Sequence, residues 1–532
     1  MASTPTDKIR DLNRSAQEHY DIDRSKKTRV LVQHGHCSQS VGAADIEAKL
    51  AVSLPPNAYL AKAGCDGACF AGTQVVVTPA NGIATRHKRV TQKTTEILLK
   101  NLSVGPDRDD AHRAYMSTQQ RIAMAGCGEM DSMSIDEYFR AGGYLGAARA
   151  LEMTPQQVIE QVKSAGLLGR GGAYFPAALK WESAQQIDSP MRHLIVNSEE
   201  GEPGIFKDRH LMEGLPHRII EGAIIAAYAS CANTAHIYIN AEANLSTERI
   251  AKAIKDATKF GMLGKNIMGS GFDLDLEILR GAGGYVCGEE TTLLNTMEGT
   301  RREPRLKPPF PTQAGLYGRP TVINNPETLS SLYFIMTQGS DAFSSIGQDN
   351  ATGTKIISLS GSVCRPGVAE VAMGTTIREI IMGIGNGILE GHELTAISIG
   401  GPSSGIFPPN MLDTPIKPGL LHDSGVMLGA GGIIAMDERM NPLQIVRKLA
   451  AYNAVESCGK CTPCREGTPR IVNALDRLMS ENGSQTDIKE LQYLAEVVSL
   501  ASLCGLGQAA GGPVNSALHF FDDQMSKMAT VN

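Results

Sequence analysis

The sequence lacks the long apolar segments of a membrane protein and the cysteine pattern of a secreted one. No run of about 18 apolar residues occurs, and the amino terminus, MASTPTDKIRDLNRSAQ, has no apolar stretch typical of a signal peptide. The eleven cysteines are odd in number and mostly scattered, which disfavours a disulfide framework and favours a reducing compartment. A net charge of −6 gives no electrostatic case for binding nucleic acid. We therefore expect a cytoplasmic protein without a membrane span.

Two common nucleotide-binding signatures are also missing. The Rossmann spacing G-x-G-x-x-G is not met, because Tyr174 stands where the third glycine would fall, and no P-loop ending G-K-[ST] is present. We find neither an internal repeat nor a low-complexity tract. A chain of 532 residues can nevertheless form several domains, each with its own core.

Four blocks follow from the pattern of apolar segments. Residues 1–115 combine a charged leader with two apolar strands and a helix, as in a small α/β domain. Residues 116–348 alternate helices with apolar strands such as HLIVNS and predict a larger α/β domain. Residues 349–440 have short β-rich runs and one helix, which predicts an α+β module. Residues 441–532 are helical and predict a bundle.

The bundle carries the cysteines with the clearest spacing. ESCGKCTPCREG places Cys458, Cys461 and Cys464 three residues apart, on one side of a turn at the start of a helix, and Cys504 follows in SLCGLG. A helical hairpin can return this fourth thiolate to the triplet, which favours a [4Fe–4S] cluster. Zinc is the alternative, although zinc sites usually pair two C-x2-C knuckles. Thiols without a metal are the remaining interpretation.

The second block contains a glycine cluster and two acidic stretches. In GLLGRGGAYFP, bare backbone N–H groups beside Arg170 and Lys180 can hold a phosphate, but a glycine cluster is also an ordinary turn. NSEEGEPG and GGYVCGEET add glutamates beside further glycine turns. Buried acids are costly unless they meet hydroxyls, N–H groups or cations, whereas solvated turn charges are the plainer explanation.

Five motifs, in the same order, resemble one known family. They are GRGGA-FP, GEPG-FKDR, GYVCGEET, the run RREPRLKPPFPTQAGLYGRPTVINNPETL, and SCGKCTPCREG. Together they resemble the NADH-binding flavoprotein (51-kDa-type) subunit of respiratory complex I. They also resemble its relatives, the diaphorase subunits of NAD-dependent formate dehydrogenases and of NAD-linked or bifurcating hydrogenases. The resemblance covers about residues 121–521.

The resemblance implies an α/β multidomain fold. It consists of a Rossmann-like FMN domain, a ubiquitin-like β-grasp domain and a C-terminal helical bundle with a [4Fe–4S] site, and these correspond to the second, third and fourth blocks. It also implies FMN without a covalent link and NAD(H) as the substrate.

The motifs carry the site residues over by position. The FMN phosphate and ribityl chain are assigned to Gly169, Arg170, Gly171 and Lys180. The rest of the flavin is assigned to Asn197, Glu199, Glu200, Tyr285, Gly288, Glu289, Glu290, Asn324 and Asn325. The nicotinamide and adenine sites are assigned to Phe175, Glu202, Lys307 and Phe310, with Glu202 as the catalytic-site residue on the nicotinamide ribose side. The [4Fe–4S] ligands are Cys458, Cys461, Cys464 and Cys504.

Three positions depart from the family pattern. Tyr174 replaces a glycine and is expected to narrow the pocket beside the flavin. Glu199 stands where Asp is commoner. Ser183 lies where some relatives have a second aromatic residue against the adenine. These departures put nucleotide affinity in question, and not the chemistry.

The first block resembles the thioredoxin-like [2Fe–2S] domain of the 24-kDa-type subunit. Cys65 and Cys69 match one ligand pair of that domain and Cys37 matches one member of the other pair, whereas Val32 occupies the remaining position. A [2Fe–2S] centre there would need a substitute ligand such as a nearby histidine. We expect instead a docking domain without a cluster.

The predicted function is a diaphorase module. It exchanges a hydride between NAD(H) and FMN and passes single electrons through the [4Fe–4S] cluster to or from partner subunits. The implied partners are a small thioredoxin-like [2Fe–2S] subunit and a larger iron–sulfur, dehydrogenase or hydrogenase subunit. The alternatives are a flavin-bearing scaffold with an impaired nucleotide site, or part of a bifurcating complex. The sequence does not identify the terminal donor or acceptor.

Overall fold

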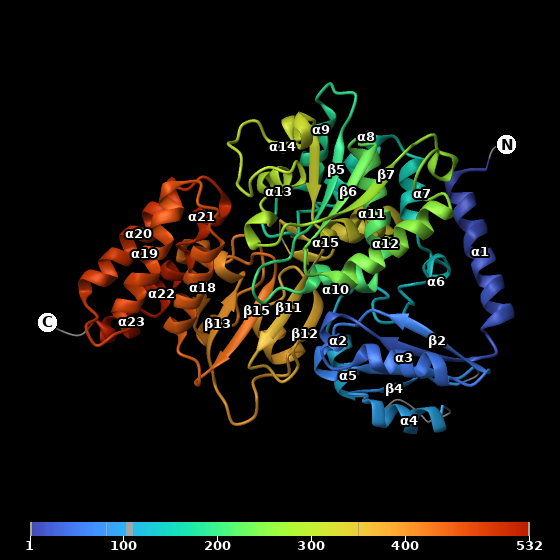
Figure 1. The fold of residues 1–532 in the computed structure, drawn as a ribbon, viewed down its shortest axis with the longest axis horizontal. Helices are drawn as coiled ribbons and strands as arrows, with labels where there is room; N and C mark the ends of the chain where they lie inside the picture. The colour runs from blue at the N-terminus through green and yellow to red at the C-terminus, as the bar shows by residue number, and fades with distance from the viewer. Residues whose placement is uncertain (1–2, 81, 103–109, 349, 530–532) are drawn as a thin grey trace.

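Three larger β-sheets, each with a different topology, organise the chain, and a helical bundle closes it (Figure 1). The structure is a computed structural model that describes residues 3–80, 82–102, 110–348 and 350–529. Position 349, where the predicted third block begins, lies outside these ranges. None of the described helices is long and apolar enough to cross a membrane.

The first sheet has the strand order β2-β1-β3-β4. Strand β1 (Thr28–Gln33) runs parallel to β2 (Ala58–Ala63) and antiparallel to β3 (Gln74–Thr78), which pairs in turn with β4 (Thr85–His87). The helices of this part are α2 (His36–Gln39), α3 (Ala43–Ser53), α4 (Gln92–Lys100) and α5 (Asp110–Ser117). The predicted strands and helix of the first block are confirmed.

The leader forms helix α1 (Pro5–Asp23), which begins with a capping box at Thr4 and Pro5 at the first helical position. The predicted boundaries group this helix with the first sheet. Its buried residues Ile9 and Ala16 belong instead to the core of the second part, where α1 packs on α6 (Ile135–Arg140) and α7 (Leu145–Leu151).

The second sheet is parallel throughout, with the order β7-β6-β5-β8. Its strands are β5 (His193–Ser198), β6 (Thr234–Ile239), β7 (Asp275–Arg280) and β8 (Thr321–Asn324). The helices of this part are α8 (Pro155–Ser164), α9 (Ala177–Gln185), α10 (Lys207–Gly214), α11 (Pro216–Ala229), α12 (Asn244–Lys259), α13 (Glu290–Met297), α14 (Pro311–Ala314), α15 (Pro326–Ser330), α16 (Leu332–Gln338) and α17 (Ser340–Ser344).

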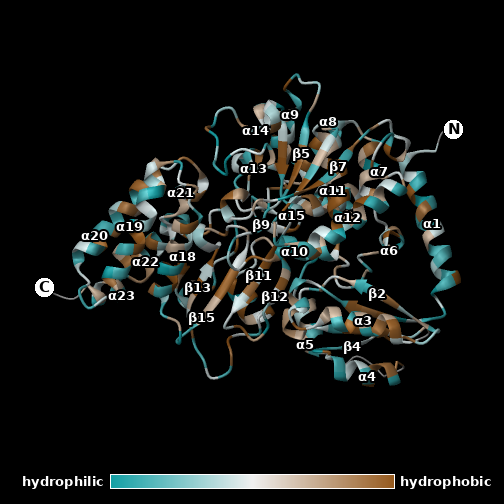
Figure 2. Cartoon of the chain, viewed as in Figure 1, coloured by the Kyte–Doolittle hydropathy of each residue, from teal (hydrophilic) through white to brown (hydrophobic). Residues whose placement is uncertain are grey.

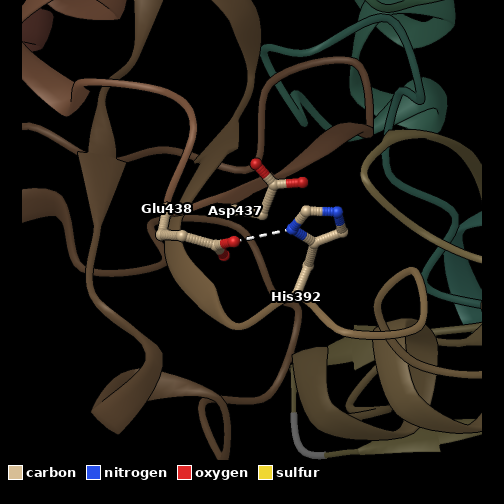
Figure 3. Close-up of side chains that lie close together, drawn as sticks. All are labelled: His392, Asp437 and Glu438. Atoms are coloured by element: carbon tan, nitrogen blue, oxygen red, sulfur yellow. Dashed lines mark hydrogen bonds and ion pairs between the residues drawn. The ribbon is translucent and has the colours of Figure 1, made fainter.

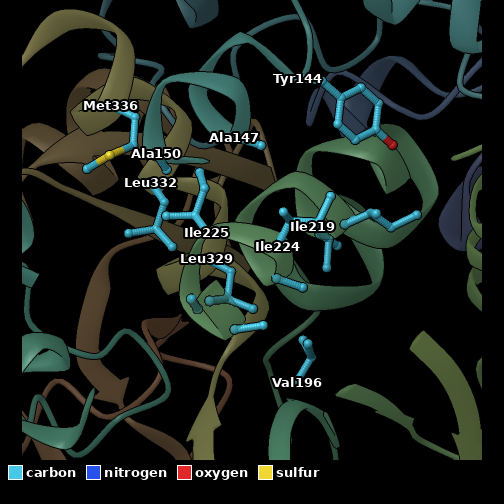
Figure 4. Close-up of a cluster of buried hydrophobic side chains, with 14 of the residues drawn as sticks. Tyr144, Ala147, Ala150, Val196, Ile219, Ile224, Ile225, Leu329, Leu332 and Met336 are labelled. Atoms are coloured by element: carbon cyan, nitrogen blue, oxygen red, sulfur yellow. The ribbon is translucent and has the colours of Figure 1, made fainter. Parts of the chain in front are cut away.

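Helix α11 lies at the centre of the largest core. Nearly all of its side chains are buried, including the charged Arg218 and Glu221. Glu221 is satisfied there by hydrogen bonds from the Tyr138 hydroxyl and the N–H groups of Tyr144 and Ala147. Figure 4 shows Ile219, Ile224 and Ile225 of α11 beside Leu329 of α15 and Leu332 of α16. This packing anchors the parallel sheet, whose strands carry apolar residues on both faces because helices cover both.

The third sheet has the order β12-β11-β15-β13-β14. Strand β11 (Thr354–Gly361) is parallel to β15 (Gly432–Asp437) and antiparallel to β12 (Gly367–Ala372), while β13 (Leu394–Ile399) joins β15 to β14 (Ile406–Phe407). A π-helical segment, η5 (Glu379–Ile384), covers it, and a short ribbon of β9 (Gly347–Gln348) and β10 (Ala351–Thr352) precedes it.

The bundle contains α18 (Pro442–Glu456), α19 (Thr462–Leu478), α20 (Gln485–Ala501), α21 (Gly505–Ala509), α22 (Gly512–Phe520) and α23 (Asp522–Met528). The three helices predicted in this region are confirmed. In Figure 2 the strands of the sheets are mostly apolar, whereas α19 and α20 carry hydrophilic residues on their outer side. The coarse prediction of a mixed α/β chain with a helical tail is therefore correct.

Candidate active site

A cavity of about 760 Å³ lies where the second sheet, the third sheet and the bundle meet. The carboxyl ends of β5 and β8 open into it, as is usual for ligand sites of parallel sheets. It is lined by every predicted FMN and nucleotide residue except Arg170, namely Gly169, Gly171, Phe175, Lys180, Asn197, Glu199, Glu200, Glu202, Tyr285, Gly288, Glu289, Glu290, Lys307, Phe310, Asn324 and Asn325. The structure thus brings together segments that lie far apart in the sequence.

The glycine loop forms one wall of the cavity. It closes on itself, because the Gly169 N–H donates to the Phe175 carbonyl at 2.9 Å. A Cβ atom on Gly171 would lie 3.3 Å from the side chain of Asn325, so glycine lets the loop approach the end of β8 closely. This loop therefore offers bare backbone next to the cavity.

Arg170 lies elsewhere than expected. Its side chain is fully buried and donates from Nε to the Thr354 carbonyl at 2.9 Å and from Nη2 to the Thr352 carbonyl at 2.6 Å. Its guanidinium therefore ties the glycine loop to β10 and β11 and does not line the cavity as a counter-charge for phosphate. Backbone carbonyls at the start of the third sheet bind the guanidinium instead. The local sequence around Arg170 does not predict a contact with residues so far along the chain.

Two lysines and two glutamates form an ion-pair network at the cavity. Lys307 Nζ lies 2.8 Å from Glu290 Oε1 and 3.2 Å from Glu289 Oε1, and Lys180 Nζ lies 3.3 Å from Glu290 Oε2. Burial would raise the pKa of Glu290, but Lys180 and Lys307 hold it below its usual value. Glu290 is thus held as a carboxylate, and Lys307 is not an idle surface charge.

Glu289 has a second task. Its Oε2 accepts hydrogen bonds from the N–H groups of Thr291 at 2.9 Å and Thr292 at 2.8 Å and so caps α13. Glu200 acts similarly on α10, because its two oxygens accept from the N–H groups of Asp208 and Arg209 at 2.7 and 3.0 Å. These two carboxylates are largely satisfied by the protein itself.

Glu199 and Glu202 differ from these capping residues. Glu199 Oε2 and Glu202 Oε1 are buried without a hydrogen-bond partner in the described part of the chain. Burial raises the pKa of each to about 7. Asn240 donates to the other oxygen of Glu199. Buried acceptors without partners indicate a site built for a ligand with N–H or O–H groups.

Aromatic rings are available at the same cavity. Phe175 and Phe310 are 49% and 51% exposed, which is high for phenyl rings that line a pocket. The Ser183 hydroxyl lies 3.0 Å from that of Thr312. Tyr174 also lines the cavity, but its hydroxyl donates to the Gly429 carbonyl at 3.0 Å. Exposed rings of this kind suit stacking on a planar base.

The four cysteines of the bundle meet beside this cavity. Cys458, Cys461, Cys464 and Cys504 pack with Tyr285, Val286 and Leu506, and these last three residues also line the cavity. Cys461 is the N-cap of α19, and Cys504 is the N-cap of α21, so the first turns of two helices present the thiols.

Known families match the two regions that form this site. The Nuo51 FMN-binding domain matches residues 162–333, and the NADH-ubiquinone oxidoreductase-F iron–sulfur binding region matches residues 444–528. The F subunit of NADH-quinone oxidoreductase from Streptomyces coelicolor is 40% identical, over 76% of this chain and 89% of the relative. The chain belongs to the family of these F subunits. It is accordingly an NADH-binding FMN subunit with a [4Fe–4S] region, an oxidoreductase component of a larger complex.

Hydrogenase components are similar to this chain as well. The HndC subunit of the NADP-reducing hydrogenase of Solidesulfovibrio fructosivorans is 42% identical, over 76% of this chain and 83% of the relative. A crystal structure of an NAD+-reducing [NiFe]-hydrogenase in the air-oxidized state is similar over 98% of this chain and 88% of that chain, with a TM-score of 0.68 and 26% identity. The family prediction is confirmed, and so are FMN and the [4Fe–4S] cluster as cofactors and NADH as substrate.

The cavity of this family member suits FMN. Its volume lies within the range of small-molecule sites, and bare glycine backbone, Lys180 and unpartnered carboxylate oxygens surround it. The family motifs do not single out Ser403, Ala430, Gly505 or Leu506, which line it as well. The first two come from glycine-rich loops of the third sheet, whose local sequence is typical of ordinary turns.

Outside the regions that match the family, the cysteines of the first sheet also converge. The Cys69 thiol neighbours those of Cys37 and Cys65. Val32 is fully buried in the core of the first sheet and offers no ligand. The nearby His36 Nδ1 lies 3.0 Å from a carboxylate of α10, that of Glu213. The expectation of a domain without a cluster stays a prediction.

A further group of potential ligands lies at the end of β15. Figure 3 shows His392 pointing at Glu438, with Asp437 beside them. His392 Nδ1 lies 2.6 Å from Glu438 Oε1, and Arg439 already pairs with both oxygens of Asp437. Asp437 is the only buried carboxylate among these three residues, and the positive charge of Arg439 beside it would repel a metal cation. We therefore assign no metal to this group.

Proposed function

We propose that this chain is a diaphorase module in which residues of the cavity wall hold FMN and NAD(H) side by side. Gly169, Gly171 and Lys180 hold the phosphate end of FMN. Gly169 closes the glycine loop through its N–H bond to the Phe175 carbonyl, Gly171 offers bare backbone at the cavity, and Lys180 supplies a cation. Asn197 and Asn324, at the carboxyl ends of β5 and β8, contact the rest of the flavin.

The remaining flavin contacts are proposed for Glu199, Glu200, Tyr285, Gly288, Glu289, Glu290 and Asn325. Among these, the unpartnered Oε2 of Glu199 is the acceptor best placed for a ring N–H group. Arg170 acts indirectly in this proposal, by fixing the glycine loop against the third sheet.

The nucleotide occupies the open side of the cavity. Phe175 and Phe310 provide exposed rings for the adenine and nicotinamide bases. Glu202 accepts from the nicotinamide ribose through its unpartnered Oε1, and Lys307 holds Glu289 and Glu290 in place beside it. The protein supplies geometry and electrostatics here, and hydride transfer needs no side-chain acid or base.

Bound FMN accepts an electron pair as a hydride from NADH and can release it one electron at a time. The observation that carries the proposal is the shared wall between the cavity and the cysteines. Tyr285, Val286 and Leu506 line the cavity and also pack against the four thiols. A site of this kind connects two-electron nucleotide chemistry with one-electron carriers.

The domain assignment is part of the proposal. The strand order of the first sheet supports a thioredoxin-like domain after the leader within 1–115, the parallel sheet a Rossmann-like domain at 116–348, and the mixed sheet a ubiquitin-like β-grasp domain at 349–440. The bundle at 441–532 carries the cluster. We propose a cytoplasmic complex in which a small [2Fe–2S] subunit and a larger iron–sulfur, dehydrogenase or hydrogenase subunit exchange electrons with this chain.

NADH-dependent dye reduction by the purified chain tests this function. We expect turnover, bleaching of the flavin on adding NADH, and FMN as the flavin released by acid. A protein that holds FMN but neither bleaches nor turns over would instead be a scaffold with an impaired nucleotide site, as the hydroxyl residues at positions 174 and 183 suggest. Finding FAD would contradict the single phosphate cradle.

A further inference from the structure

The last turn of α18 holds two loops of the cavity wall. Tyr452 Oη donates to the Gly201 carbonyl at 2.6 Å, and the Tyr285 N–H donates to Glu456 Oε2 at 2.7 Å. Gly201 and Tyr285 line the cavity, whereas Tyr452 and Glu456 do not. The rings of Tyr285 and Tyr452 also approach each other, with centroids 5.9 Å apart.

A third loop joins the same junction from the third sheet. It is η6 (Gly401–Ser403), one of the glycine-rich loops. Asn453, which is 1% exposed, donates from Nδ2 to the Pro402 carbonyl at 2.7 Å. The Ser403 hydroxyl lies 2.7 Å from that of Tyr285. The end of α18 therefore binds loops from the second and third sheets at one place.

The junction continues directly into the cysteine site. Only Ser457 separates Glu456 at the end of α18 from Cys458. Tyr285 packs in the same apolar group as all four thiols. Any shift of the last turn of α18 consequently moves the wall of the cavity and the first cysteine together, because packed interiors transmit displacements.

We propose that Tyr452, Asn453 and Glu456 form a clamp that sets the position of the nucleotide loop and of the cluster relative to the flavin. The inference rests on the proposed function of the cavity. The three are positioning residues, since they act through Gly201, Pro402 and Tyr285. Gly201 directly precedes Glu202, so the clamp also fixes the carboxylate assigned to the nicotinamide ribose.

The clamp has a kinetic consequence. Catalysis between bound groups depends steeply on their placement, and a displacement of about 1 Å from a distant substitution is enough to slow it strongly. Electron transfer likewise falls off with the distance between donor and acceptor. Loosening the clamp is therefore expected to weaken NADH binding and to slow reduction of the cluster, while leaving FMN and iron in place.

The first test is Tyr452→Phe in the protein that contains FMN and the cluster. This change removes the hydrogen bond to the Gly201 carbonyl and keeps the aromatic ring. We expect the apparent KM for NADH to rise, and the rate of cluster reduction after mixing with NADH to fall, each by roughly threefold to tenfold. Stopped-flow absorbance follows the flavin and rapid-freeze EPR follows the cluster. Tyr493→Phe, on the exposed face of α20, is the matched control, because Tyr493 is 65% exposed.

Glu456 provides a second test, independent of the first. Glu456→Gln retains an oxygen that accepts from the Tyr285 N–H, so we expect nearly normal rates, whereas Glu456→Ala should behave like Tyr452→Phe. Equal losses in the Gln and Ala variants would mean that charge matters and not the hydrogen bond. That result overturns the clamp.

Two further outcomes also decide against it. If the Tyr452 and Glu456 variants only lower the Tm, and KM and cluster reduction match the wild type, these residues are merely structural and the clamp is wrong. If NADH fails to bleach the flavin even in the wild type, the proposed function itself fails, and the clamp falls with it. Bleaching in the wild type thus separates the two failures.

Discussion

Glu202 shows how burial sets the chemistry of a single carboxyl group in the cavity. Its pKa is raised to about 7, mainly by burial, against which Lys207 and Lys355 lower it. An unfolded glutamate titrates near 4.3. Between about pH 4.3 and 7 the folded chain therefore binds the extra proton, so stability falls as the pH rises through this window.

Glu202→Gln should remove part of that pH dependence. The amide of glutamine does not ionise, so the variant avoids the cost of burying a charge. We therefore expect its free energy of unfolding to rise relative to that of the wild type between pH 5 and 8, by about 3 kcal/mol at pH 8. Thermal unfolding of both proteins without nucleotide, followed across this range, measures the effect. A constant difference in Tm between the two proteins would show that Glu202 does not titrate there.

Lys307 carries a prediction about nucleotide binding. Lys307→Ala removes a cation assigned to the nucleotide side, while Lys180 still pairs with Glu290 and the N–H groups of α13 still hold Glu289. We therefore expect a KM for NADH raised about tenfold, lower turnover and normal FMN content. Steady-state kinetics and extraction of the flavin check this. Lys255→Ala on the exposed side of α12 is the control. Loss of FMN would place Lys307 on the flavin side instead.

At the level of residues, the motifs predicted that segments far apart in the sequence share one cavity, and all of the assigned flavin and nucleotide residues except Arg170 line it. Motif order identified Phe175, Lys180 and Phe310 as residues of one site, and they do meet there. Arg170 was expected at the phosphate, but carbonyls of β10 and β11 bind its side chain. Ser403 escaped notice, because its approach to the cavity depends on how two sheets pack.

Between elements, a buried ionic network joins the second and third sheets. Glu327 of α15 accepts from Lys355 of β11 at 2.6 Å and lies 2.9 Å from Lys207 of α10. Both lysine side chains are fully buried. Burial lowers the pKa of Lys355 to about 8, with Glu327 opposing that shift. Asp208 also pairs with Lys207, at 2.7 Å, so Glu327 is the main counter-charge of Lys355 and shares Lys207 with Asp208.

Glu327→Gln should loosen the junction of the two sheets. Removing one partner of a buried ion pair leaves an uncompensated charge and typically costs about 3 to 5 kcal/mol. We expect a clearly lower Tm in the loaded protein. Glu248→Gln, at an exposed position of α12, should change the Tm little. An unchanged Tm in the Glu327 variant would contradict this prediction. It would mean that Lys207 and Lys355 can become neutral in the folded protein with little loss of stability.

The strands and helices themselves followed well from local patterns. Apolar runs such as HLIVNS predicted β5, and the helical periodicity of the tail predicted α18, α19 and α20. The packing of α1 on α6 and α7 did not follow, since a polar helix carries little information about its partner. The strand order of the third sheet was equally hidden, because β11 pairs with β15 far along the chain.

On the scale of the whole molecule, the two cysteine sites differ in the number of thiols available to bind a cluster. The bundle site has four thiols beside the cavity, whereas the first sheet offers three and a buried valine. Cys65→Ser should therefore alter neither iron content nor turnover. Loss of about two iron atoms and of a separate EPR signal would show a [2Fe–2S] centre with an unusual fourth ligand.

The central claim is that electrons pass between the nucleotide cavity and the cysteine site that shares its wall. Cys461→Ser tests it most directly, by iron analysis and EPR after reduction with NADH. We predict the loss of about four iron atoms and of the cluster signal. NADH should still bleach the flavin, while onward transfer to a partner protein stops. Normal iron content with an intact signal, or undiminished transfer to the partner, would contradict the account.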